Sequence, residues 1–75
     1  MRGLKTMLGG KILKTGRKIR GLTQVKVAVI YGVNVSTYKR WEKGTHAVTF
    51  DDVAAICDHV FKLPLAEVQQ VAAHA

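Results

Sequence analysis

The chain has 75 residues, of which 48% are apolar and one is a cysteine, Cys57, and its formal net charge is +7. This length and apolar content predict one folded domain and exclude a chain that is disordered by composition, and the lone cysteine excludes a fold held together by internal disulfides. Ten of the twelve cationic residues and none of the five acids lie in residues 1–41, which predicts a face for a polyanion, with a merely solubilising surface as the alternative.

Residues 1–10 contain three glycines and are expected to form a flexible basic segment ahead of a single domain that spans residues 11–75. They hold no apolar run of signal-peptide length, and no stretch of the chain reaches the roughly 18–20 apolar residues of a membrane-spanning helix. We therefore expect a cytoplasmic protein with no membrane contact. The sequence leaves Met1 and Met7 open as its start.

Residues 11–20 carry apolar side chains at helical spacing and are expected to form the first helix. Thr23 suits the N-cap of the next helix. Residues 25–31 alternate in a way that, taken alone, predicts a strand. Ala28, Gly32 and the helix that follows have the spacing of a known supersecondary unit, and this resemblance implies instead a helix that ends in a tight turn.

The rest of the chain is expected to form three further helices joined by short loops. Asn34 or Ser36 can cap a helix that runs to about Lys43. Thr49-x-x-Asp52 resembles a capping box for the next helix, and Pro64 fits the first position of the last one. The expected apolar faces of these two helices are Val53, Ile56, Cys57, Val60 and Phe61 in the first and Leu65, Val68, Val71 and Ala72 in the second.

A dense set of small, apolar and polar residues lies around the predicted turn: Gly21-Leu22-Thr23-Gln24, Val27-Ala28, Gly32-Val33, Ser36-Thr37 and Trp41-Glu42-Lys43-Gly44. With no gap, this set resembles the Xre/Cro-type helix-turn-helix family of repressors, and the resemblance extends over roughly residues 11–68. It implies an all-α fold: a five-helix, lambda-repressor-like DNA-binding domain whose second and third helices form the helix-turn-helix.

The resemblance gives the matched residues mechanical roles. Ala28 is small where the two helices cross, Gly32 supplies the positive φ of the turn, and Val33 closes the bend. Tyr38 and Trp41 are expected in the core, with base stacking as the alternative for Trp41.

In this family the second helix of the motif enters the major groove, and residues near its N-terminus meet base edges. Arg40 is expected to donate two hydrogen bonds to a guanine, whereas Val35 departs from the polar residue common at its position and could only pack on a thymine methyl. The base-reading residues implied by the resemblance are Asn34, Val35, Ser36, Lys39 and Arg40.

Thr23, Gln24 and Lys43 match family positions that contact phosphates. Arg17 and Glu42 match an ion pair between the first helix and the recognition helix, with a free phosphate contact by Arg17 as the alternative. The basic residues before the motif are expected to add phosphate contacts or to reach a minor groove, and for Arg2 and Lys5 a solubilising tail is equally open; they are Arg2, Lys5, Lys11, Lys14, Lys18 and Arg20.

The predicted function is therefore a homodimeric, sequence-specific transcription repressor that binds an inverted repeat in double-stranded DNA, as small Cro-like regulators of phages and mobile elements do. No catalytic site, cofactor or metal site is expected, because the histidines are scattered and Asp51 and Asp52 serve the start of a helix. The acidic-to-neutral C-terminal half is the expected dimer face, with Phe61, Leu63, Leu65, Val68 and Val71.

Two other functions remain open. Apolar residues stand at Val25, Val29 and Ile30, where family members usually carry polar ones, which fits an antitoxin-type module that binds a protein partner and its own operator. Burial of these three residues under the N-terminal segment is the competing interpretation. The strand pattern of residues 25–31 would fit a small α+β RNA-binding protein.

Overall fold

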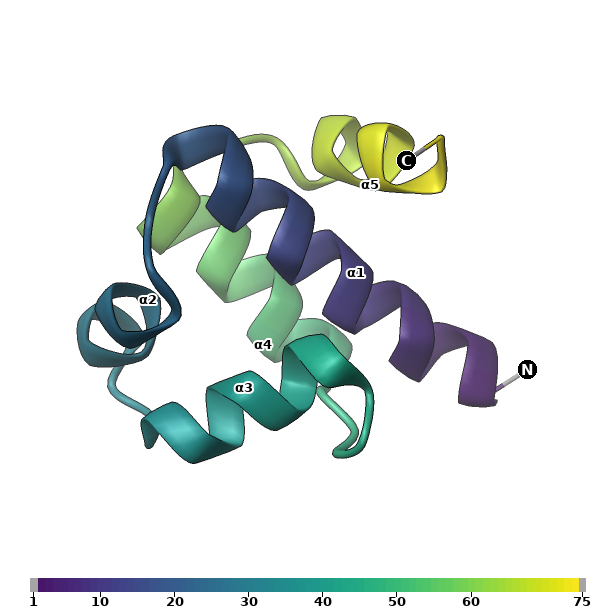
Figure 1. Cartoon of the computed structure of the whole chain (residues 1–75). Coiled ribbons are helices and arrows are strands. Elements are labelled where there is room, and N and C mark those ends of the chain that lie inside the picture. The colour runs from purple at the N-terminus through teal and green to yellow at the C-terminus, as the bar shows by residue number, and fades with distance from the viewer. Residues whose placement is uncertain (1, 75) are drawn as a thin grey trace.

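Helix α1 (Arg2–Arg20) lies between α3 (Val35–Lys43) on one side and α5 (Leu65–Ala73) on the other (Figure 1). Helix α2 (Gln24–Tyr31) follows at one end of α1, and α4 (Phe50–Ala55) runs directly into a π-helical segment, η1 (Ile56–Phe61). The computed structural model describes residues 2–74, with side chains from Leu8 onward. Within that range every regular element is helical, so the all-α prediction is confirmed and the strand interpretation of residues 25–31 is wrong.

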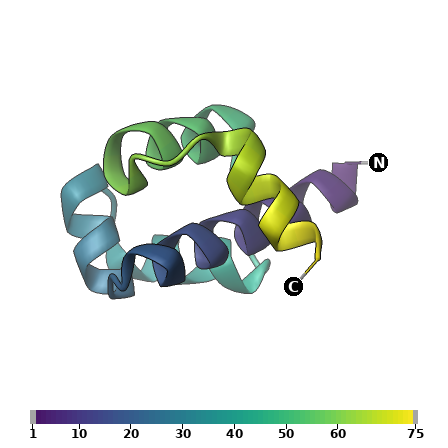
Figure 2. The same cartoon turned by 90° about the horizontal axis from the view of Figure 1, so that it is seen from above.

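Helix α1 touches most of the molecule. Seen from above, α4 and η1 run along one side of it and α5 crosses over its N-terminal half (Figure 2). The core formed in this way is continuous across all helices. Its buried side chains are Ile12, Leu13, Val27, Ala28, Tyr38, Trp41, Val48, Val53, Ile56, Cys57, Phe61, Val68 and Ala72.

Helix α1 begins at Arg2, whereas the sequence placed its start at Lys11. Two glycines of α1 are points of close contact, and one of them, Gly10, lies in the segment that the sequence predicts to be flexible. Gly10 is buried against the backbone carbonyls of Trp41 and Glu42, and Gly16 is buried against the ring of Phe61. Each glycine lowers helix propensity by about 1 kcal/mol relative to Ala, but its missing side chain lets α1 approach α3 and η1 closely.

Replacing Gly10 by Ala should therefore destabilise the domain, although Ala is the better helix former. The new Cβ would overlap the Trp41 carbonyl oxygen and lie 3.1 Å from that of Glu42, and both belong to backbone that cannot rotate away. Overpacking costs about 1–3 kcal/mol, which outweighs a propensity gain of about 1 kcal/mol. Urea unfolding should show a lower midpoint for Gly10→Ala and an unchanged one for Lys11→Ala, whose site is exposed. Equal or higher stability of Gly10→Ala would contradict this contact.

The C-terminal end of η1 is closed by Arg20. Its Nε donates a hydrogen bond of 2.6 Å to the Phe61 carbonyl, and its Nη2 donates one of 3.0 Å to the Lys62 carbonyl. Lys62 has a left-handed conformation, with φ of 55°, and the Leu63 amide donates back to the Cys57 carbonyl over 3.0 Å. The terminal carbonyls of the π-helix thus obtain partners that the helix itself cannot provide.

One side-chain hydrogen bond joins α2 to the start of α4. The Tyr31 hydroxyl donates to Asp52 Oδ1 over 2.5 Å, and this bond raises the pKa of Tyr31 to about 12. Thr49 caps α4, because its Oγ1 accepts from the Asp52 amide over 3.1 Å and donates to Asp52 Oδ2 over 3.0 Å. Pro64, predicted at the first position of α5, lies one residue before the helix, at its N-cap.

Candidate nucleic-acid interface

The turn between α2 and α3 is fixed by local hydrogen bonds. Gly32 ends α2 with φ of 93°, and its amide donates to the Ala28 carbonyl over 2.8 Å. Asn34 caps α3, since its Oδ1 accepts from the Ser36 amide over 2.8 Å. Thr23 caps α2 in the same manner, accepting from the Lys26 amide over 3.0 Å. The Thr23 cap fixes the start of α2, and the Asn34 cap fixes the start of α3 and therefore which side chains of α3 face outward.

The inner faces of the two helices meet around aromatic residues. Tyr38 and Trp41 are buried, and their rings pack edge to face with centroids 6.3 Å apart and an interplanar angle of 69°. Val27 and Ala28 are buried beside them on α2. Trp41 therefore belongs to the core, and the alternative of base stacking by its ring is wrong.

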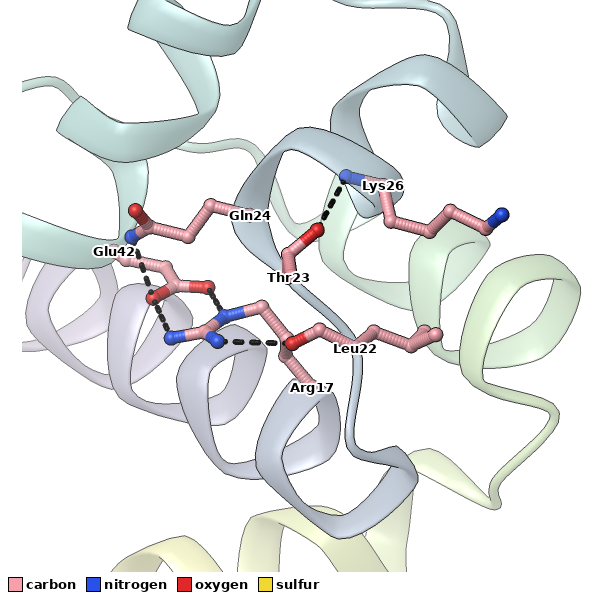
Figure 3. Close-up of polar contacts among 6 residues, drawn as sticks. All are labelled: Arg17, Leu22, Thr23, Gln24, Lys26 and Glu42. Carbon is pink, nitrogen blue, oxygen red and sulfur yellow. Dashed lines mark hydrogen bonds and ion pairs between the residues drawn. The ribbon is translucent and has the colours of Figure 1, made fainter.

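Arg17 and Glu42 connect α1 to α3 (Figure 3). Arg17 Nε donates to Glu42 Oε2 over 2.7 Å and Nη2 donates to Oε1 over 3.1 Å, while Nη1 donates to the Leu22 carbonyl over 3.0 Å. Gln24 Nε2 also donates to Glu42 Oε1, over 3.1 Å. Arg17 is thus held by the protein in a fork-to-fork pair and is not a free phosphate ligand.

Burial and hydrogen bonding act in opposite directions on Glu42. Burial raises the pKa of its carboxyl, whereas the hydrogen bonds from Arg17 and Gln24 and the nearby Tyr38 hydroxyl lower it, and the net result is a pKa below its ordinary value. The pKa of Arg17 is raised, chiefly by its hydrogen bond to Glu42. Both groups are charged at neutral pH, so α1, α2 and α3 are joined by one ionic network.

The Tyr38 hydroxyl lies beneath this network. Burial, followed by the Glu42 carboxylate, raises the pKa of Tyr38 far above its ordinary value. Among the described residues, however, the hydroxyl has no hydrogen-bond partner of good geometry, although Glu42 is close enough to influence it. A buried hydroxyl without a partner carries its desolvation penalty without compensation.

Removing that hydroxyl should cost little. Tyr38→Phe is expected to leave the free energy of unfolding unchanged or to raise it by up to about 1 kcal/mol, because an unsatisfied polar group is replaced by an apolar one of the same shape. The measurement is a urea titration of both proteins at pH 7. A loss of more than about 1 kcal/mol would show that the hydroxyl donates to Glu42 in solution.

The outer face of α3 carries most of the predicted base-reading residues. Ser36, Lys39 and Arg40 are exposed, and no ion pair occupies either cation in the described part of the chain. Val35 is half-buried and packs against the core, so only part of its side chain is left for the predicted contact with a thymine methyl. The Asn34 oxygen is used to cap α3, which leaves only its amide nitrogen free to donate outward.

The predicted phosphate-binding residues fall into two groups. Lys43 and Lys18 are exposed, and Thr23 stands at the N-terminus of α2, where backbone amides face outward. Gln24 and Arg20 donate hydrogen bonds within the protein, Gln24 to Glu42 and Arg20 to the end of η1, and their contact with phosphates stays a prediction. The side chains of Arg2 and Lys5 lie outside the described residues.

A cleft of about 710 Å³ opens between α1, the start of α2 and the C-terminal half of α3. It contains Lys14, a residue that the sequence grouped only with a general basic segment. The signal that could have singled it out is the spacing of Lys11, Lys14 and Lys18, which share one side of α1. The full lining is Lys14, Arg17, Leu22, Thr23, Gln24, Lys39, Glu42 and Lys43.

The predicted dimer residues are separated by the fold. Phe61 and Val68 are each about 1% exposed and belong to the core of the single chain, so their assignment to a dimer face is corrected. Leu63 and Leu65 are half-buried, and Val71 is 49% exposed. Only the last three can contact another molecule without unfolding this one.

The outer face of α2 carries three exposed apolar residues next to Lys26. Val25, Val29 and Ile30 are all more than half exposed, so the interpretation that the N-terminal segment buries them is wrong. The described residues contain no cluster of three metal-ligating side chains. Among them, too, no helix is long and apolar enough to cross a lipid bilayer.

The comparisons with known proteins agree with this geometry at the level of a family. A family model described as Helix-turn-helix matches residues 13–68, which is most of the chain. No curated protein and no solved structure matches it.

Proposed function

The chain belongs to the Xre/Cro-type helix-turn-helix family of DNA-binding transcription regulators, and from this we propose that it is a homodimeric repressor of an inverted-repeat operator. The observation that carries the proposal is the exposed, cationic outer face of α3, held by a capped start and a glycine turn. Two such helices enter successive major grooves about 34 Å apart. Occupying a promoter in this way blocks polymerase without any catalytic step or cofactor.

The exposed side chains of α3 have different proposed roles, and these depend on their position along the helix. Ser36 and Arg40 stand where they can meet base edges, and Arg40 can pair with a guanine through two parallel hydrogen bonds. Lys43, in the last turn of α3, lies where a phosphate contact would position the helix without reading sequence. The Arg17–Glu42 pair holds α3 against α1 so that this orientation is retained.

The proposal is tested by selecting bound fragments from a random duplex library. An enriched inverted repeat, with half-sites one helical turn apart, is the expected result. Enrichment of a single half-site would contradict binding as a homodimer. If bound fragments are recovered but share no sequence, sequence-specific repression would be contradicted.

Arg40→Ala is expected to weaken binding to the selected operator by about 1–3 kcal/mol and to relax the preference at one base pair of each half-site. Lys43→Ala is the matched control, because losing a phosphate contact weakens all sequences similarly. Fluorescence anisotropy on the operator, on operators altered at single positions and on random duplex separates the two effects. If Arg40→Ala affects specific and random DNA equally, Arg40 contacts the backbone instead of a base.

A second candidate function is favoured by the apolar outer face of α2. Val29 is 70% exposed, with Val25 and Ile30 beside it, and side chains of this kind gathered on one helix often mark a protein contact. An antitoxin-type regulator would use α3 for its operator and α2 for a partner protein. Co-purification of a second polypeptide with the wild type, and its loss with Val29→Lys, would support this function.

A further inference from the structure

Residues 25–31 are helical in the fold, but their sequence is typical of a strand. The segment is Val-Lys-Val-Ala-Val-Ile-Tyr, so five of its seven residues are β-branched or aromatic and Lys26 is its one charged residue. Segments of about six or seven residues with this composition, free of Pro and Gly, are those that form stacked β-sheets between chains. The local preference of α2 therefore conflicts with the fold that contains it.

Helix α2 is short and lies at the edge of the domain (Figure 1). Only two of its eight residues are buried, and an isolated helix of this length is unstable in water. At one end Gln24 Nε2 donates to Glu42 Oε1 over 3.1 Å, and at the other the Tyr31 hydroxyl donates to Asp52 Oδ1 over 2.5 Å. Local opening of α2 breaks these two hydrogen bonds and gives up little burial, and it releases the whole segment.

The released segment can pair with the same segment of a second chain without opposing its charges. In a parallel, in-register sheet each Lys26 would lie against another Lys26, which is destabilising. In an antiparallel pair centred on Ala28, Lys26 lies opposite Ile30 instead. The other face of such a pair is wholly apolar, and each strand contributes to it Val25, Val27, Val29 and Tyr31.

We propose that α2 opens locally and that residues 25–31 of two chains then pair as antiparallel strands, which starts self-assembly of the protein into a β-sheet. The partner is a second copy of this chain, and the pairing requires no DNA. Val25, Val29 and Ile30 are exposed in the folded helix, so two chains can meet through them before either one opens. Because α2 is half of the helix-turn-helix, assembly removes the surface that α2 and α3 form together.

Native-state hydrogen exchange tests the local opening. The amides of residues 25–31 should exchange at a rate that low urea does not change, and faster than the amide of buried Leu13, which opens with the whole domain. Tyr31→Phe removes the hydrogen bond to Asp52, whose carboxylate keeps its bond from Thr49, and should speed the exchange of the segment about ten-fold. If these amides exchange only together with the core, α2 does not open locally and the proposal is overturned.

Incubation of the concentrated protein below its thermal midpoint tests the assembly. The wild type should gain thioflavin T fluorescence and the split amide I band of an antiparallel sheet. Val29→Lys places a charge on the apolar face of the strand pair, whereas in the folded helix this site is 70% exposed and Lys has the higher helix propensity. The variant should therefore keep its helical circular dichroism and lose the assembly.

Two further variants separate the segment from its net charge. Ile19→Lys adds the same charge at an exposed β-branched residue of α1, and it should assemble as the wild type does. Tyr31→Phe keeps the strand preference and loosens the helix, so it should assemble faster than the wild type.

Three results would overturn the proposal. A wild type that stays helical throughout the incubation would exclude the conversion. Equal loss of assembly in Val29→Lys and Ile19→Lys would assign the effect to net charge. A parallel sheet, or an assembled form in which residues 25–31 are not protected from hydrogen exchange, would contradict the pairing.

Discussion

Replacing Arg17 by Met is expected to lower the free energy of unfolding by about 3–5 kcal/mol. Arg17 is 15% exposed and its partner Glu42 is 3% exposed, so the variant leaves a carboxylate out of water with only Gln24 to donate to it. It also removes the hydrogen bond to the Leu22 carbonyl, which fixes the link between α1 and α2. Operator affinity should fall with stability, because the orientation of α3 depends on this pair.

Two controls distinguish the ion pair from simple loss of packing. The double variant Arg17→Met with Glu42→Leu should recover most of the stability, since it removes both charges together. The wild type should lose the contribution of Glu42 as the pH falls through its lowered pKa, because protons then bind the folded state less readily than the unfolded one. In Arg17→Met, burial raises the pKa of Glu42 and reverses that slope. Urea titrations from pH 3 to pH 8 measure both effects. If Arg17→Met lowers the free energy of unfolding by less than about 1 kcal/mol at pH 7, the pair contributes no more than an exposed salt bridge does.

The parts of the fold that the sequence predicted correctly are those decided by short-range chemistry. Thr23, Gly32 and Asn34 act on backbone groups a few residues away, so their roles in capping and turning follow from residue type. The helical nature of α2 needed more than its own pattern. Its alternating valines indicate a strand, and only the spacing of the surrounding motif favoured the helix that the structure has.

The errors concern residues whose role depends on a distant segment. Gly10 lies at a contact with α3, and Arg20 reaches the end of η1 across more than half the chain. Neither partner can be recognised from neighbouring residues, so the sequence predicts flexibility around Gly10 and a phosphate contact by Arg20, and it predicts neither of these intramolecular contacts. The cleft around Lys14 was missed for the same reason, since it exists only where α1 crosses α3.

The predicted dimer face shows the same limit on a single helix. Val68 and Val71 are three residues apart and share an apolar stripe, which periodicity treats as one surface. In the structure Val68 is 1% exposed and Val71 is 49% exposed. The angle at which α5 crosses α1 decides which side of the stripe is buried. That angle cannot be predicted from the sequence of α5 alone.

Placing the same charge at these two positions should therefore give two different results. Val68→Asp is expected to unfold the domain, because burying an unpaired carboxylate costs several kcal/mol and a domain of this size has little stability to lose. Val71→Asp should keep its helical circular dichroism at a cost of about 0.3–1 kcal/mol from the helix dipole. If α5 forms the homodimer, Val71→Asp should sediment as a folded monomer and bind the full operator more weakly than the wild type. A folded Val71→Asp that remains dimeric would place the interface elsewhere, and a folded Val68→Asp would contradict the packing of α5 on α1.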